Sequence, residues 1–183
     1  DFSGDGKLLA TGGGAPSRGG ELKLWDVATG KLVREVTEAH SDTVFAVEFS
    51  ADNKLLASCA ADKFVKVFDV ATGKFVKSFE GHTHHVLGVS WMSDGRTLAS
   101  SGADNVVKVW DFVTGDQKRT IQGFAKEVTS LNFAGDSVNA VATCGDKTVR
   151  LLRVDNGSTV RSFAGGNDFM YSGAVSIDGK TVI

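Results

Sequence analysis

The segment GHTHHVLGVSWMSDGRTLASSGADNVVKVWD, residues 81–111, is the most informative part of the sequence, because its landmark residues recur every 42 or 43 residues. The Trp-Asp pair that ends it corresponds to Trp25-Asp26, Phe68-Asp69 and Leu152-Arg153. The Gly-His pair that begins it corresponds to Ala39-His40, Gly123-Phe124 and Gly165-Gly166. A fixed period of this length is the signature of a repeat architecture. The chain therefore uses one supersecondary unit four times.

Each unit is a series of short strands separated by turns. In the second unit, the apolar residues alternate with period two over 42–50 and 64–70, whereas 55–61 is a nearly continuous apolar run and 75–81 follows a turn. This pattern predicts four antiparallel strands per unit, with the middle strands buried on both faces. Such a sheet cannot cover its own faces, so we expect successive sheets to stack on one another.

Composition is consistent with one all-β domain and excludes some classes of function. The 183 residues include 22 glycines and one proline, and the formal net charge is −2. This charge offers no electrostatic footprint for nucleic acid or an anionic membrane surface. No apolar run approaches the length of roughly 20 residues that spans a bilayer. We expect a soluble chain with free, buried thiols at Cys59 and Cys144, and composition does not distinguish cytoplasm from periplasm.

The GH…WD pattern, the turns Ser3–Lys7 and Ser93–Arg96 and the DVATGK strand ends resemble WD40 repeats over nearly the whole chain. The resemblance implies a β-propeller of four-stranded blades around a central channel. The near-consensus turns are similar to those of bacterial members of the family. We expect one WD40 domain over 1–183, with repeats at approximately 1–38, 39–80, 81–122 and 123–164 and the start of a fifth at 165–183.

The resemblance also implies a hydrogen-bonded chain inside each blade, formed by the GH histidine, a serine or threonine, the turn aspartate and the WD tryptophan. The third unit matches this set completely with His82, Ser100, Asp104 and Trp110. The second unit has His40, Ser58 and Asp62 but Phe68 in place of tryptophan. The fourth keeps Thr143 and Asp146, and the first keeps Thr11 and Trp25.

Two catalytic interpretations of these histidines are weaker than the structural one. A Ser–His–Asp set suggests a hydrolase. However, the set recurs at the same spacing in adjacent units, and no G-x-S-x-G elbow is present. His84 and His85 lack the nearby cysteines or carboxylates that a closed zinc site needs. We therefore expect no catalytic residues, no metal and no cofactor, with His85 at the surface.

In WD40 proteins, partners usually dock on the narrower top face around the channel mouth. The positions that the resemblance assigns to this face are Thr43, Phe45, His85, Leu87, Glu127, Thr129, Phe169 and Tyr171. Four of these side chains are large and apolar where solvent exposure is expected, which is typical of an interface. The alternative is that some of them pack against neighbouring blades. Small residues at Ala61, Ala103 and Gly145 would leave room for a protruding peptide.

The stretch ATGGGAPSRGGELKLW, residues 10–25, carries about four more residues than its counterparts. A glycine-rich loop with Arg18 could cradle an anion. It lacks the G-K-[ST] of a phosphate-binding loop. An enlarged hairpin loop is the simpler interpretation.

These observations together predict a non-catalytic scaffold that binds a protein or peptide partner. One alternative is a structural or sensor module attached to a catalytic or electron-transfer domain elsewhere in a longer chain. A propeller enzyme is less favoured, since Glu127 is the one charged residue at the expected axis. About four blades are present, whereas such rings usually close with about seven or eight. We expect a piece of a longer propeller, with self-association of two copies as the alternative.

Overall fold

The computed structural model describes residues 1–176 and 180–183, in which fifteen β-strands form four antiparallel sheets. The first sheet contains β1 (Leu8–Ala15), β2 (Gly19–Asp26) and β3 (Leu32–His40). The second contains β4 (Val44–Phe49), β5 (Leu55–Ala60), β6 (Val65–Asp69) and β7 (Phe75–Phe79). The third contains β8 (Val86–Trp91), β9 (Thr97–Gly102), β10 (Val107–Asp111) and β11 (Gln117–Ile121). The fourth contains β12 (Val128–Phe133), β13 (Asn139–Cys144), β14 (Thr148–Arg153) and β15 (Thr159–Ala164).

The all-β fold with four antiparallel sheets in sequence order is confirmed; the first sheet has three strands, and each of the other three has four. In the register of the repeat, Phe2 is the counterpart of Phe49, the last residue of β4. Phe2 itself forms only an isolated bridge with Leu9.

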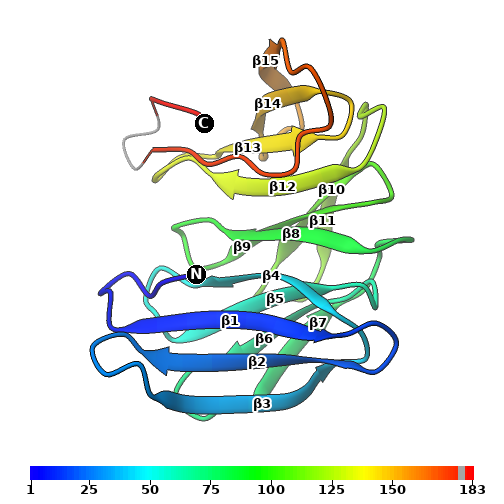
Figure 1. Cartoon of the computed structure of the whole chain (residues 1–183). Coiled ribbons are helices and arrows are strands. Elements are labelled where there is room, and N and C mark those ends of the chain that lie inside the picture. The colour runs from blue at the N-terminus through cyan, green and yellow to red at the C-terminus, as the bar shows by residue number, and fades with distance from the viewer. Residues whose placement is uncertain (177–179) are drawn as a thin grey trace.

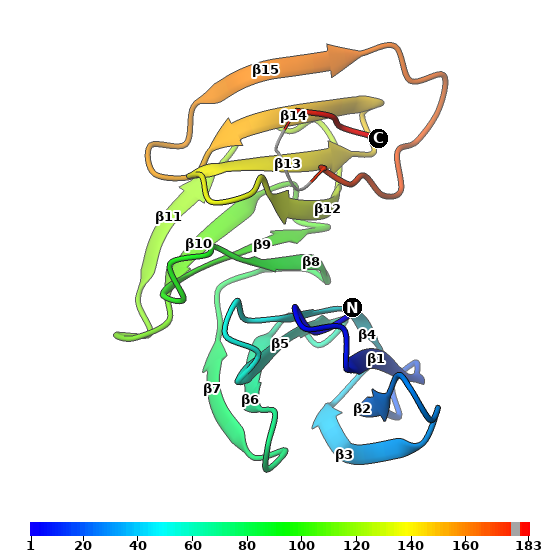
Figure 2. The same ribbon diagram turned by 90° about the vertical axis from the view of Figure 1, so that its left-hand side faces the viewer.

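The sheets are arranged as a fan, with β4, β8 and β12 along its inner side and β7 and β11 toward the outside (Figures 1 and 2). Three hydrophobic clusters form the core, and each cluster lies between two successive sheets. The middle strands supply most of their residues; β5 and β9, for example, are buried along almost their whole length. The sheets are thus held together by apolar contact on both faces, as the continuous apolar runs predict.

In the first three sheets, the turn between the third and fourth strands is built by an aspartate at the end of the third strand. In the second sheet, Asp69 Oδ1 accepts a hydrogen bond from the backbone N–H of Thr72 at 2.7 Å. The backbone N–H of Gly73 donates to the Asp69 carbonyl at 2.7 Å, and Gly73 has a φ of +71°. This left-handed conformation is accessible to glycine at little cost, which explains the recurring T-G pair.

The extra residues of the first unit lengthen a hairpin. The pairing of β1 with β2 continues to Ala15 and Gly19, so that residues 16–18 alone form the turn. Ser17 at its tip has a φ of +59°, and its N–H donates to Asp42 Oδ1 at 2.9 Å. The insertion is therefore an extended hairpin tied to the second sheet and not simply a larger loop.

The segment after β15 returns to the inner side of the fan and runs beside β12. Thr129 Oγ1 donates to the carbonyl of Met170 at 2.7 Å, and Asn132 Nδ2 donates to the carbonyl of Gly173 at 2.9 Å. The segment thus begins where a fifth unit is expected, although residues 177–179 of that predicted unit lie outside the described residues. Within residues 1–176 and 180–183, no helix has the length and apolar character to cross a bilayer.

Candidate functional site

The structure brings the four residues of the third-sheet network together. His82 Nδ1 lies 2.9 Å from both carboxylate oxygens of Asp104, and His82 Nε2 lies 2.8 Å from Ser100 Oγ. Trp110 Nε1 donates to the same Ser100 oxygen at 2.9 Å. Because an indole N–H can only donate, the serine hydroxyl is free to donate to Nε2, which leaves the Nδ1 proton for the carboxylate. The chain of donors therefore runs from Trp110 to Asp104.

The carboxylate at the end of this chain is held in its ionised form. Burial by itself would raise the pKa of Asp104, but the hydrogen bonds from His82 and from the backbone N–H of Thr83 outweigh it and lower the pKa below its usual value. The Thr83 N–H lies 2.9 Å from Asp104 Oδ2. Asp104 thus fixes both the imidazole and the start of the loop that follows His82.

The second sheet repeats this geometry without the tryptophan. His40 Nδ1 lies 3.0 and 2.9 Å from the two oxygens of Asp62, and Nε2 lies 2.8 Å from Ser58 Oγ. Phe68, at the tryptophan position, offers no N–H, and Ser58 Oγ lies 3.4 Å from the carbonyl of Lys66 instead. The Ser58 hydroxyl can therefore donate either to His40 Nε2 or to the carbonyl of Lys66. The direction of donation found in the third sheet is not fixed in the second.

In the fourth sheet, Phe124 holds the histidine position, and the turn aspartate binds an arginine instead. Arg150 Nη2 lies 2.7 Å from Asp146 Oδ2, and its guanidinium lies 4.6 Å from the centre of the Phe124 ring. Thr143 Oγ1 instead pairs with Thr129 Oγ1 at 2.8 Å and with Ser130 Oγ at 2.7 Å. Thr143 and Asp146 thus belong to two separate clusters. In the first sheet, Trp25 Nε1 donates to Thr11 Oγ1 at 3.0 Å.

The burial of the histidine network argues against the interpretation of Ser100, His82 and Asp104 as a hydrolase triad. The relative exposure of Ser100 is 0%, and that of the His82 side chain is 1%. A serine nucleophile must reach a substrate carbonyl, and this hydroxyl is enclosed within the sheet. Of the two remaining histidines, His84 is exposed, and its Nδ1 accepts the backbone N–H of His85 at 2.9 Å.

Six of the eight residues assigned to the top face line one pocket, with a volume of about 380 Å³. They are Phe45, Leu87, Glu127, Thr129, Phe169 and Tyr171. They come from β4, β8, β12, the loop before β12 and the segment after β15. His85 borders the pocket through its ring, whose centre lies 6.0 Å from that of Phe45. Thr43 lies just before β4 and is half-buried.

Large aromatic side chains in this pocket are open to solvent. Tyr171 is 77% exposed and Phe45 is 47% exposed. The Phe169 and Tyr171 rings pack with their centres 5.0 Å apart and an angle of 45° between them. Two rings thus form one wall of the pocket, and Phe45 faces it across Leu87.

The space above Gly145, which the sequence suggested as room for a peptide, is already taken. A Cβ atom at Gly145 would lie 2.3 Å from Cε2 of Phe169, so the phenylalanine ring rests directly on this glycine. The small residue therefore positions an aromatic side chain of the pocket. Phe169 thus packs against a residue of the fourth sheet, as expected if some top-face side chains pack on a neighbouring blade.

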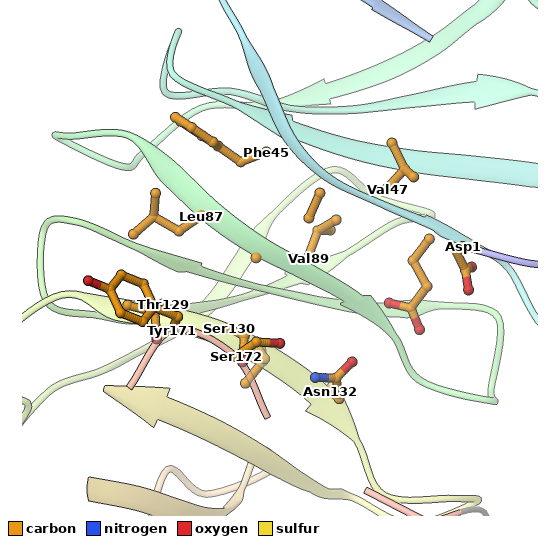
Figure 3. A pocket seen from close by; sticks show the side chains of 14 residues that line it. Asp1, Phe45, Val47, Leu87, Val89, Thr129, Ser130, Asn132, Tyr171 and Ser172 are labelled. Carbon is orange, nitrogen blue, oxygen red and sulfur yellow. The ribbon is translucent and has the colours of Figure 1, made fainter. Parts of the chain in front are cut away.

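The pocket continues into a trough along the inner strands, with a volume of about 370 Å³ (Figure 3). Phe45, Leu87 and Tyr171 lie at one end of it, and Asp1 and Asn132 lie at the other. The trough and the top-face pocket share four lining residues, which makes them one continuous surface.

A ladder of polar side chains in and beside this trough, which the sequence did not predict, joins successive sheets. The four counterparts in the repeat are Asp1, Glu48, Ser90 and Asn132. The first three each accept the backbone N–H of the next sheet's inner strand: Phe49 at 2.8 Å, Trp91 at 3.0 Å and Phe133 at 3.1 Å. Polar residues 42 apart at 48, 90 and 132 were a signal that could have revealed it.

Glu48 is the unusual member of the ladder. Burial raises its pKa to about 8, although hydrogen bonds from Ser90 and from the N–H of Trp91 oppose this shift. Between the ordinary carboxyl pKa and pH 8, the folded chain holds a proton that the unfolded chain has released. The free energy of unfolding therefore falls as the pH rises through this window.

We expect Glu48→Gln to remove this part of the pH dependence. The loss of stability between roughly pH 5 and pH 9 should be smaller than in the unsubstituted chain by about 4 kcal/mol, since the neutral amide needs no deprotonation. Urea unfolding at the two pH values measures the difference. Glu80→Gln, which alters an exposed carboxylate, is the control. Parallel pH profiles for the unsubstituted and Glu48→Gln chains would contradict the assignment.

The glycine-rich hairpin also borders a pocket, with a volume of about 420 Å³. Its lining includes Arg18, but also the carboxylates of Glu21 and Glu38. Two acidic groups next to one guanidinium make a poor anion site. The structure therefore favours the hairpin interpretation of this stretch.

Comparison with known proteins identifies the repeat. The family model described as "WD domain, G-beta repeat" matches residues 1–26, 30–69, 73–111 and 115–152. WD repeat-containing protein 1 of Xenopus tropicalis is 38% identical over 80 residues, which cover 43% of this chain and 12% of that protein. The WD repeat domain-containing protein 83 homolog of Dictyostelium discoideum is 38% identical over 52 residues, covering 28% and 16% respectively.

Among solved structures, the crystal structure of the RRP9 WD40 repeats superposes with a TM-score of 0.86 at 23% identity. The match covers 96% of this chain and 53% of that one, so this chain spans about half of that structure and less of the two curated relatives. Both relatives are eukaryotic, so the narrower resemblance to bacterial members is not supported.

Proposed function

We propose that this chain, which belongs to the WD40 repeat family, is a non-catalytic scaffold that binds a protein or peptide partner on its top face. One observation carries the proposal: two exposed aromatic side chains, Phe45 and Tyr171, meet the half-buried Leu87 and Phe169 in a single pocket. Exposed aromatic rings gathered in a concave site lose unfavourable contact with water when a partner covers them. Aromatic residues are also enriched at the centres of protein interfaces.

The double substitution Phe45→Ala, Tyr171→Ala tests this proposal. We expect it to weaken partner binding by at least about tenfold, because aromatic residues at the centre of an interface contribute most of its energy. Both side chains are substantially exposed, so the free energy of unfolding should change little. Partners captured by the unsubstituted chain and identified by mass spectrometry are then titrated against the variant.

The matched control is Val113→Ala, Val160→Ala, which removes two exposed apolar side chains outside the pocket. This variant should bind each partner as the unsubstituted chain does. If the aromatic double variant stays folded and keeps normal affinity for all captured partners, the top face is not the docking site.

Self-association is a second candidate, and the first sheet provides its observation. Trp110 is 1% exposed because it faces the second sheet, whereas its counterpart Trp25 lies on the outward face of the first sheet and is only partly buried. A further sheet on that face would bury it. Light scattering behind a sizing column decides the question: a concentration-independent dimer supports pairing of two copies, and a monomer rejects it.

A further inference from the structure

The charge of the top-face pocket is set by one residue. Of its six lining residues, only Glu127 carries a charge at neutral pH, and its side chain is half-buried. Within residues 1–176 and 180–183, the carboxylate of Glu127 has neither a hydrogen bond nor an ion pair. A partly desolvated carboxylate without a partner favours a positively charged ligand group.

The adjoining trough does not offset this charge with a basic side chain. Its ionisable side chains are Asp1 and Glu48, both of them acids, and the α-amino group of Asp1 donates to the carbonyl of Ala10 at 3.0 Å. Neither the trough nor the pocket is lined by lysine, arginine or histidine among the described residues. Because burial raises the pKa of Glu48 to about 8, Glu48 is mostly uncharged at neutral pH. The charge of the continuous surface near the aromatic rings therefore comes from Glu127, and no lining basic side chain offsets it.

Two basic groups outside the pocket, Lys147 and His85, have contacts of their own. Lys147 Nζ donates to the carbonyl of Asn167 at 3.0 Å. The His85 ring lies against His84, 4.4 Å between centres, and it is one of the groups that lower the pKa of Asp42. Neither group forms an ion pair with Glu127 among the described residues.

The aromatic side chains that line the pocket can also bind a cation. Phe45, Phe169 and Tyr171 line the pocket together with the carboxylate. The face of an aromatic ring attracts a cation, and the attraction grows when the cation is partly desolvated. An arginine side chain can use both features, because its flat guanidinium stacks on a ring while its N–H groups reach a carboxylate.

We propose that the top-face pocket takes a cationic side chain of the partner, arginine or lysine, with Glu127 as its counter-charge. The inference rests on the proposed function and specifies the chemistry of the partner at the same site. It makes Glu127 a specificity-determining residue, while the aromatic side chains supply the contact area.

Small probes test the charge preference without a known partner. Nα-acetyl-arginine amide is compared with Nα-acetyl-citrulline amide, which has nearly the same shape but no charge, and with the acidic Nα-acetyl-glutamate amide. Binding to the full chain is followed by saturation-transfer NMR. We expect the arginine probe to bind at least about fivefold more tightly than the citrulline probe, and the glutamate probe to bind most weakly.

The variant Glu127→Gln keeps the size of the side chain and removes its charge. It should abolish the preference for arginine over citrulline and leave the affinity for citrulline unchanged. Glu80→Gln is the matched control, since it removes an exposed carboxylate outside the pocket, and it should keep the full preference. Equal thermal unfolding of the three chains shows that the fold is intact.

Three results would overturn the inference: equal binding of arginine and citrulline, tighter binding of the glutamate probe, or an arginine preference that survives Glu127→Gln. In each case the proposed docking function still stands if Phe45→Ala, Tyr171→Ala weakens partner binding. Loss of arginine binding in that double variant as well as in Glu127→Gln would place the cation in the aromatic pocket.

Discussion

Replacing His82 with alanine is expected to lower the free energy of unfolding by about 3 kcal/mol, because the change leaves a buried serine and a partly buried carboxylate without their shared partner. His82 lies within 2.9 Å of Asp104 and 2.8 Å of Ser100, so both contacts are lost at once. Removing one member of a buried polar network costs more than the bonds contribute, since the remaining groups stay desolvated.

Urea unfolding followed by tryptophan fluorescence measures this loss. His84→Ala is the matched control, because that neighbouring imidazole is exposed and accepts a single hydrogen bond, from the His85 N–H. We expect its effect to stay within about 0.5 kcal/mol. If the two alanine variants were equally stable, the network would not be holding the third sheet.

The second large effect is expected from Gly88→Ala in the inner strand β8. A Cβ atom at this position would lie 2.7 Å from Ser101 Oγ and 3.0 Å from the backbone nitrogen of Leu131 in the fourth sheet. The hydroxyl can rotate, but the backbone cannot move without separating the two sheets. We therefore expect a loss of about 2 kcal/mol, in the range found for overpacked cores.

The same urea titration measures the effect of Gly88→Ala, and hydrogen exchange of β12 shows where it acts. Faster exchange in β12 than in β4 is expected, since the added methyl group points at the fourth sheet. Gly4→Ala is the control, because the nearest atom to its Cβ would be 3.4 Å away. An unchanged urea midpoint for Gly88→Ala would mean that the sheets are packed less closely than the structure describes.

The sequence was sufficient to predict the sheets because each of them repeats the same landmarks. Trp110 and its counterparts mark the third strand, and the apolar runs such as 55–61 mark the second. The partners of His82 were predictable from the family resemblance for the same reason. A feature that recurs at a constant spacing can be recognised without knowing where it lies in space.

For features that join different sheets, the spacing showed equivalent positions but not the contacts that those positions make. Asp1, Glu48, Ser90 and Asn132 occupy equivalent positions but are chemically different, and three of them share a role only because a backbone N–H of the next sheet comes within reach. The contact between the Phe169 ring and Gly145 likewise depends on the path of the segment after β15. Such contacts follow from the stacking of units.

The contact of Arg150 with Asp146 in the fourth sheet, where Phe124 holds the histidine position, was predictable in part. Lys66, Lys108 and Arg150 are 42 residues apart, so a basic residue at this position is part of the repeat. Its role changes from sheet to sheet, however. Lys66 lies 3.9 Å from Asp62, whereas Arg150 lies 2.7 Å from Asp146 and covers the Phe124 ring. The 42-residue spacing therefore predicts a basic residue at this position. Its contact with the turn aspartate is close in the fourth sheet, where no histidine binds that aspartate.

The stacking of the sheets in sequence order has a mechanical consequence. The strongest contacts between sheets join neighbours, as between β8 and β12 and between β4 and β8. A linear array of this kind yields at its weakest junction first. When the chain is pulled from its two ends, each sheet that gives way releases about 42 residues, or roughly 140–150 Å of extended chain. The molecule would thus lengthen under tension in discrete steps, and the order of those steps would rank the junctions by strength.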